Sequence, residues 1–167
     1  MAAELRGIIN GTFGVVVDAW AQGSTLLDSV ALAQAGGVAE ADPARDLSGR
    51  DSADKLALLI DAAFGRWIDL DHIATAGIDR ITGDPQGVKL IARATRTRQG
   101  ITAYVAPESP QPESFLGRAH GAENRLEIEL ETGEVIRLRA QGAGRWPTTA
   151  SVMGDLHEVA RVAENTS

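Results

Sequence analysis

A loop and the helix after it, between residues 33 and 55, concentrate the residues that could do chemistry. The segment AQAGGVAEADPARDLSGRDSADK holds the carboxylates Glu40, Asp42, Asp46 and Asp51 and ends on Lys55. A lysine amine beside a carboxylate is suited to moving a proton to or from a bound polar molecule. Asp and Gly are also ordinary loop formers, and Asp51 would make an ordinary helix N-cap. The segment therefore predicts either a polar site or a capped loop.

Lysine usage draws attention to Lys55. Among the 16 basic residues only Lys55 and Lys89 are lysines, and the others are arginines. Arginine cannot supply a titratable amine, so a retained lysine indicates a position where that amine is wanted. Asp51 and Lys55 lie four residues apart and share one face of a helical turn. The alternative for this pair is a surface ion pair worth roughly a few tenths of a kcal/mol.

Three helices are predicted to position this segment. Thr12 would cap a helix over residues 13–21, although the valines at 15–17 would also suit a strand. Ser24 would cap the next helix, which two glycines at 36–37 would end. The helix that Asp51 opens would close at Gly65. Its buried stripe is predicted to comprise Leu56, Leu59, Ile60 and Phe64.

The second half of the chain predicts strands. Alternating apolar residues favour strands over residues 88–95 and 101–105, and a hairpin turns at residues 132–133. In that hairpin Leu126, Ile128 and Leu130 would face the core, and the charges on the other face would be a solvated surface. His72 has no evident partner and is predicted to be packed or exposed rather than catalytic. The resulting fold class is α+β, a mixed sheet of four or five strands with helices packed on one face.

Composition narrows the class of protein. The 167 residues fit a single domain over 1–167, and the absence of cysteine excludes disulfides and thiolate metal sites; no metal site is predicted. The net charge of -7 argues against binding nucleic acid or an anionic membrane. No apolar run approaches a membrane span and the N-terminus lacks a signal-peptide pattern, so a cytoplasmic globular protein is expected.

A glycine-rich turn precedes the last predicted helix, over residues 148–163. Such a turn between a strand and a helix can cradle an anion at the helix N-terminus. The full dinucleotide-binding fingerprint is absent from residues 141–147, and no βαβ unit surrounds the turn. Taken alone, the turn does not predict a nucleotide site.

The polar segment resembles the signature of the homoserine dehydrogenase family. That signature has the form A-x3-G-hydrophobic-small-x2-D-P-x2-D-hydrophobic-x-G-x-D-x3-K. It is matched here by Ala33, Gly37, Val38, Ala39, Asp42, Pro43, Asp46, Leu47, Gly49, Asp51 and Lys55. The opening GIINGT and the closing GAGRWPTTASVMGDL resemble the family's GILNGTTN and GAGxxPTASAVxxDL. The resemblance covers residues 7–160.

The resemblance implies roles for individual residues. Lys55 matches the lysine that shuttles the proton of the substrate hydroxyl, Asp51 the aspartate that orients the substrate, and Glu40 the glutamate that binds its ammonium group. Asp46 and Thr12 match further substrate-binding positions. The closing turn implies that Gly142 and Gly144 face a nicotinamide cofactor.

The departures from the family concern the cofactor. A full homoserine dehydrogenase begins with a nucleotide-binding Rossmann domain, and this chain starts just past where that domain would end. We therefore expect this chain alone to bind no cofactor, and NAD(P) to be used only with a nucleotide-binding partner protein. The family dimerises by extending the sheet in this region, which implies a homodimer.

Three functions follow as hypotheses. The first is a stand-alone homoserine dehydrogenase-like enzyme acting on a small aspartate- or homoserine-related amino acid. It would use Lys/Asp proton transfer without a nicotinamide, in an elimination, isomerisation, hydration or cyclisation. The second is the catalytic module of an NAD(P)-dependent homoserine dehydrogenase, with the Rossmann domain in trans or truncated. The third is a non-catalytic amino-acid-binding protein.

Overall fold

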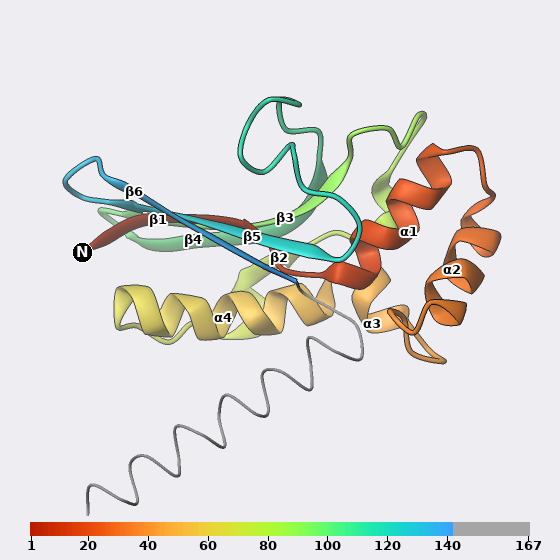
Figure 1. Cartoon of the computed structure of the whole chain (residues 1–167). Coiled ribbons are helices and arrows are strands. Elements are labelled where there is room, and N and C mark those ends of the chain that lie inside the picture. The colour runs from red at the N-terminus through yellow and green to blue at the C-terminus, as the bar shows by residue number, and fades with distance from the viewer. Residues whose placement is uncertain (142–167) are drawn as a thin grey trace, which may run out of the picture.

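The computed structural model describes residues 1–141 as one six-stranded sheet with helices below it and at one end (Figure 1). The strands are β1 (Ala2–Ile8), β2 (Ile73–Thr75), β3 (Lys89–Thr97), β4 (Gly100–Glu108), β5 (Glu123–Leu130) and β6 (Val135–Gln141). The α-helices are α1 (Gly11–Ala21), α2 (Leu26–Ala35), α3 (Ala44–Leu47) and α4 (Arg50–Phe64), and two 3₁₀ turns cover Leu70–His72 and Ile78–Arg80. The prediction of one domain over 1–167 reaches beyond this part of the chain and stays a prediction.

The sheet has the order β2-β4-β3-β1-β5-β6. All neighbouring strands are antiparallel except β2 and β4, which are parallel, so the predicted mixed α+β class is confirmed. The predicted count of four or five strands is wrong because β1 and β2 were missed. In β1 the charged Glu4 and Arg6 lie on the face away from α4, so the sequence lacks the continuous apolar run that would have indicated a strand. β2 is only three residues long.

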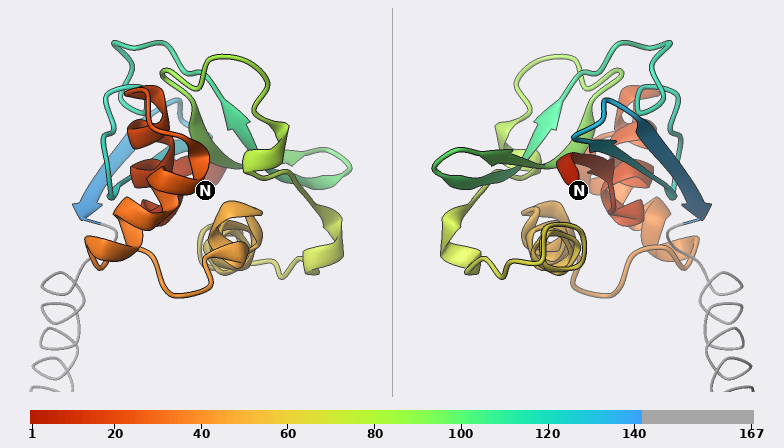
Figure 2. Two further views of the ribbon diagram at one scale, coloured as in Figure 1. Left: turned by 90° about the vertical axis from the view of Figure 1, so that its right-hand side faces the viewer. Right: turned by 90° about the vertical axis from the view of Figure 1, so that its left-hand side faces the viewer.

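Helix α4 lies against one face of the sheet along its length (Figures 1 and 2). Leu56, Ile60 and Phe64 of the predicted stripe are buried, and Leu59 is partly buried against the same core. The helix ends, as expected, at Gly65, which has a left-handed backbone with φ 64°. This packing fixes α4 and with it the polar residues of its first turn.

Three predicted helix starts are corrected. Residues 15–17 are helical, and α1 is capped by Asn10, whose Oδ1 accepts from the Phe13 N–H at 2.8 Å, rather than by Thr12. The N-cap of α2 is Thr25, not Ser24. Helix α4 begins after Gly49, whose φ is 81°, so Asp51 lies inside the first turn instead of capping it. Asp51 therefore keeps both carboxylate oxygens free of backbone capping contacts and available to its neighbours.

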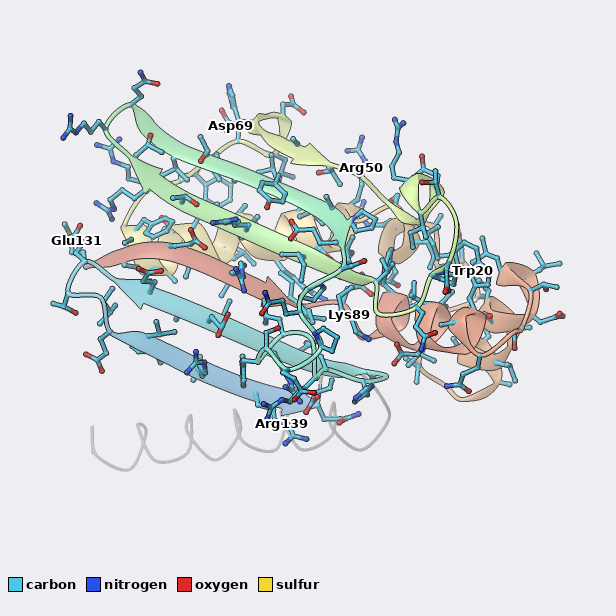
Figure 3. All side chains as sticks on the ribbon, turned by 90° about the horizontal axis from the view of Figure 1, so that it is seen from above. Trp20, Arg50, Asp69, Lys89, Glu131 and Arg139 are labelled. Atoms are coloured by element: carbon cyan, nitrogen blue, oxygen red, sulfur yellow. The ribbon has the colours of Figure 1, made fainter. Side chains whose placement is uncertain are left out.

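The charged face of the last hairpin is largely solvated, as predicted, with Glu129, Arg137 and Arg139 exposed, but β5 carries two buried charges just before the predicted segment. Figure 3 looks onto this face, with Arg139 labelled on the outer strand β6. Glu123 and Arg125 of β5 are only 7% and 8% exposed, because residues 109–122 cross over this end of the sheet. Arg125 donates to the backbone oxygens of Phe115 and Arg118 in that crossing segment. These charges hold the segment to the sheet.

Two further observations concern the rest of the chain. His72 is exposed, one of the two placements that were predicted for it. Within residues 1–141 no helix is long and apolar enough to cross a membrane.

Candidate active site around Lys55

The polar residues singled out by the sequence meet where α1, α3 and α4 begin or end, at one end of the sheet (Figure 1). Lys55 Nζ lies 2.7 Å from Asp51 Oδ2 and donates a longer hydrogen bond, 3.4 Å, to the backbone oxygen of Ile9. The side chain of Lys55 is 49% exposed and that of Asp51 is 29% exposed. The amine is thus oriented by two acceptors and remains open to a molecule arriving from solvent.

Asp46 of α3 is the second carboxylate of the cluster. Asn10 Nδ2 donates to Asp46 Oδ1 at 3.0 Å and to the Asp46 backbone oxygen at 3.3 Å. Burial raises the pKa of Asp46 above its usual value, and the nearby Asp51 carboxylate raises it further. The Asn10 and Thr12 hydrogen bonds and the Lys55 charge oppose this shift without cancelling it. The negative charge of Asp46 is therefore less stable in this site than it would be in water.

The charges of the cluster do not balance. Asp46 and Asp51 supply two carboxylates, and Lys55 supplies one ammonium group. An additional cation at this place would be attracted by the carboxylates and would relieve their mutual repulsion. The arrangement can therefore bind a small molecule with an amino group and exchange a proton with it through Lys55.

Thr12 belongs to the same region, whereas Glu40 does not reach it. Thr12 is buried, and its hydroxyl donates to the backbone oxygen of Val38 at 3.2 Å, tying α1 to the signature loop. Glu40 is exposed; its backbone oxygen accepts from Gln34 Nε2 at 3.1 Å. Within residues 1–141 its carboxylate contacts none of the cluster residues.

Gly142 and Gly144, which were predicted to face a cofactor, lie outside the described residues. The other lysine, Lys89, is buried at 5% exposure and pairs with Asp18 at 2.8 Å. Asp18 also accepts from the Gly121 N–H at 2.7 Å, so this pair links α1 and β3 to the segment before β5. Of the two lysines, Lys55 is the one whose amine is accessible.

Sequence reasoning missed Asn10 and the Ile9 carbonyl. Asn10 is 2% exposed and serves both as the cap of α1 and as a donor to Asp46. The capping role of Asn10 could have been predicted, because asparagine is a preferred N-cap residue and Asn10 precedes Phe13 by three positions. The backbone oxygen of Ile9 carries no sequence signal, since its role follows from where the chain leaves β1.

Several cavities lie away from Lys55. One of about 610 Å³ lies over the charged face of the sheet and is lined by Arg6, Phe115 and Glu127 among others. Its arginines and glutamates are largely paired with one another, as in the Arg6–Glu127 and Arg137–Glu127 pairs. In the part of the chain that the structure describes, no group of His, Cys, Asp and Glu could hold a metal ion.

Comparison with known proteins assigns the chain to a family. The family model described as homoserine dehydrogenase matches residues 2–157. The homoserine dehydrogenase of Pseudomonas aeruginosa is 34% identical over 94% of this chain, and that of Corynebacterium glutamicum is 31% identical over 95%. The crystal structure of a Thiobacillus denitrificans homoserine dehydrogenase superposes on 98% of the chain with a TM-score of 0.85 and 30% identity. One from S. aureus gives a TM-score of 0.83 and 26% identity.

The matched region is a limited part of these relatives. The chain spans 38% of the length of the Pseudomonas enzyme, 39% of the Corynebacterium enzyme and 40% of the Thiobacillus chain. Fold and family are therefore shared along almost the whole of this chain, whereas most of each relative has no counterpart in it.

Proposed function

The chain belongs to the homoserine dehydrogenase family, and we propose that it supplies the substrate-binding and proton-transfer half of that reaction. The observation that carries the proposal is the position of Lys55, whose amine lies 2.7 Å from Asp51 Oδ2 beside a second carboxylate, Asp46. The relatives named homoserine dehydrogenase give the substrate class: homoserine, or the aspartate semialdehyde to which it is oxidised.

Lys55 acts as the proton donor and acceptor in this proposal. When the aldehyde is reduced, the ammonium group of Lys55 gives a proton to the oxygen that becomes the hydroxyl. When the alcohol is oxidised, the neutral amine accepts that proton, so oxidation requires a deprotonated Lys55. Asp51 orients the amine in both directions through the hydrogen bond that it accepts from Lys55 Nζ.

The carboxylates bind the amino end of the substrate. The cluster has one more carboxylate than ammonium groups, and a substrate ammonium would restore the balance. We assign Asp46 and Thr12 to this binding region. Glu40 would contact the substrate ammonium only if the exposed loop that carries it moved toward the cluster.

Residues 1–141 do not form a binding site for the nicotinamide cofactor that would accept the hydride. A dinucleotide site needs a glycine-rich turn between a parallel strand and a helix. Between residues 1 and 141 the single parallel pair, β2 and β4, is not joined through such a turn. We therefore propose that NAD(P) is held by a nucleotide-binding domain outside these residues, and assign no hydride-transfer step to this chain.

A reconstitution experiment tests the proposal. The chain is mixed with, and separately fused to, the nucleotide-binding domain of the Pseudomonas relative, and homoserine-dependent reduction of NADP⁺ is followed by absorbance. Binding of homoserine by the chain alone is measured in parallel by NMR titration. Turnover that disappears in Lys55→Met supports the proposal. The proposal fails if neither form turns over and homoserine does not bind.

The alternative functions receive no specific support. A cofactor-independent elimination, isomerisation, hydration or cyclisation would use the same Lys55 and Asp51, but no contact in residues 1–141 favours it over oxidoreduction. A purely binding protein would not need the accessible amine of Lys55. Product formation from homoserine without NADP⁺ in the same assay would favour the first alternative.

We also propose that the protein forms a homodimer through β6. Every residue of this edge strand is exposed, including the apolar Ile136 and Leu138 at 39% and 51%. An uncovered edge strand presents unpaired backbone groups to another chain. Light scattering after size-exclusion chromatography should give twice the chain mass, and Leu138→Lys should shift that mass toward the monomer.

A further inference from the structure

Unpaired arginines gather at the end of α4 that is remote from Lys55. Most arginines of residues 1–141 form an ion pair with a carboxylate, as Arg93 does with Glu4 at 2.8 Å. The arginines without such a pair in this part of the chain are Arg50, Arg66, Arg96 and Arg98. Arginines without a carboxylate partner are unexpected in a chain whose net charge is -7, because acidic residues outnumber basic ones.

Three of these arginines line one pocket. Its volume is about 220 Å³, and it is formed by the residue after Gly65 and by the turn between β3 and β4. The complete lining is Arg66, Arg96, Thr97, Arg98, Gln99, Gly100 and Ile101, without a carboxylate. The pocket therefore concentrates positive charge with no acidic side chain of its lining to neutralise it.

Arg96 has a donor that the fold does not use. Its Nη2 donates to the Phe64 backbone oxygen at 3.1 Å, and its guanidinium group lies 5.2 Å from the centre of the Phe64 ring. These contacts cap the C-terminal end of α4 and explain why an arginine stands here. They leave Arg96 Nε buried and without a partner among the described residues. A buried N–H without an acceptor is costly, and an anion bound in the pocket that Arg96 lines would lie beside this guanidinium group.

We propose that Arg66, Arg96 and Arg98 form a binding site for a small oxyanion of the phosphate class. Guanidinium groups bind phosphate oxygens through paired N–H donors, which matches the donor type gathered here. The pocket is smaller than the ~300–1,000 Å³ of sites for drug-sized ligands, which favours inorganic phosphate or a small phosphate ester. This site is separate from Lys55 and does not depend on the proposed dehydrogenase reaction.

The test is a titration of the ¹⁵N-labelled chain with inorganic phosphate, sulfate and methyl phosphate at constant ionic strength set by chloride. The Arg Nε–H resonances are followed by NMR. We expect a saturable shift of the Arg96 Nε–H, and weakening of roughly tenfold in Arg66→Gln and in Arg98→Gln, as expected for losing one charge-assisted hydrogen bond. Arg50→Gln is the matched control, because Arg50 is also unpaired but lies outside the pocket; its phosphate affinity should be unchanged.

The outcomes separate the proposal from general charge attraction. Arg96→Lys keeps the positive charge and removes Nε, so it should lose phosphate binding; its fold is checked by circular dichroism. If that variant unfolds, the exposed Arg66 and Arg98 variants decide the question. Tighter binding of methyl phosphate identifies a phosphate ester as the ligand, and equal binding identifies the free anion. The proposal is overturned if no shift saturates, or if Arg50→Gln weakens binding as much as the pocket variants.

Discussion

Two clusters of charged side chains, one around Lys55 at the end of the sheet and one around Glu123 on β5, shift the pKa of a carboxylate in opposite directions. Around Lys55, Asp46 has a raised pKa because of burial and the neighbouring Asp51 carboxylate. Under the segment of residues 109–122, burial also pushes the pKa of Glu123 upward, but hydrogen bonds from Arg125 and Arg139 outweigh it and leave the pKa lowered. One carboxylate is short of positive partners, and the other has more than one.

The difference separates a site from a structural contact. Glu123 and Arg125 are each 9% exposed at the side chain and 2.8 Å apart, so their charges are satisfied within the fold. The carboxylates around Lys55 are more exposed, and their charge is not fully compensated. A group that the fold leaves unsatisfied is available to a ligand, whereas a satisfied group is not. The predictions below test this distinction, from the largest expected effect to the smallest.

Lys55→Met should reduce turnover in the reconstituted assay by a factor on the order of 10³, as expected when a general acid–base group is lost. Because Lys55 is half exposed, the free energy of unfolding should change by no more than about 0.5 kcal/mol. Lys55→Arg is the control for charge, and it should also be inactive. Activity in either variant near that of the unmodified chain would contradict the role of Lys55.

Arg125→Met should lower the free energy of unfolding by about 3 kcal/mol, because it removes the buried partner of the Glu123 carboxylate. The lowered pKa of Glu123 adds stability that is present above the ordinary glutamate pKa and is lost as the pH falls through the folded value. The loss caused by Arg125→Met should therefore shrink in acid, as measured by urea unfolding at several pH values. A loss that is the same at pH 3 and pH 7 would show that packing, not charge, is responsible.

Asp46→Asn should have the opposite effect on stability. The raised pKa of Asp46 means that the folded state binds its proton more tightly than the unfolded state. Ionised Asp46 therefore costs stability, and this cost grows as the pH rises from the ordinary aspartate pKa through the folded value. Asparagine keeps an acceptor for Asn10, so we expect a gain of up to about 1 kcal/mol at pH 7 that vanishes in acid.

The same Asp46→Asn variant should bind homoserine more weakly, and the titration that measures homoserine binding checks this. A variant that is stabilised and still binds with unchanged affinity would remove Asp46 from the site. A variant that is destabilised at pH 7 would instead contradict the assignment of its charge as unfavourable.

Arg137→Gln should have the smallest effect. Arg137 pairs with Glu127 at 2.9 Å, but its side chain is 56% exposed, and exposed pairs contribute little. The free energy of unfolding should change by less than about 0.5 kcal/mol in the same urea experiment. A loss as large as that of Arg125→Met would erase the distinction between the buried and exposed parts of this face.

The sequence was sufficient to predict that Asp51 and Lys55 lie side by side, but not which residues surround them. The four-residue spacing of Asp51 and Lys55, on a helix whose apolar stripe was readable, was sufficient to place the pair. The contacts of Asn10 with Asp46 join residues 36 positions apart, and no local pattern encodes them. The burial of Glu123 and Arg125 was also unreadable, because it depends on where residues 109–122 cross the sheet. Local periodicity reports one element at a time, whereas both features arise between elements.

The central place of β1 in the sheet has a consequence for the order of folding. Arg6 in β1 lies opposite Arg93 in β3 on one side and Glu127 in β5 on the other. During synthesis β1 thus waits for residues made about 90 and 120 positions later before either of its edges is paired. Such long loops slow folding more than they reduce stability, because closing them precedes the contacts that compensate for it. We therefore expect the hairpins β3–β4 and β5–β6 to form before β1 pairs between them.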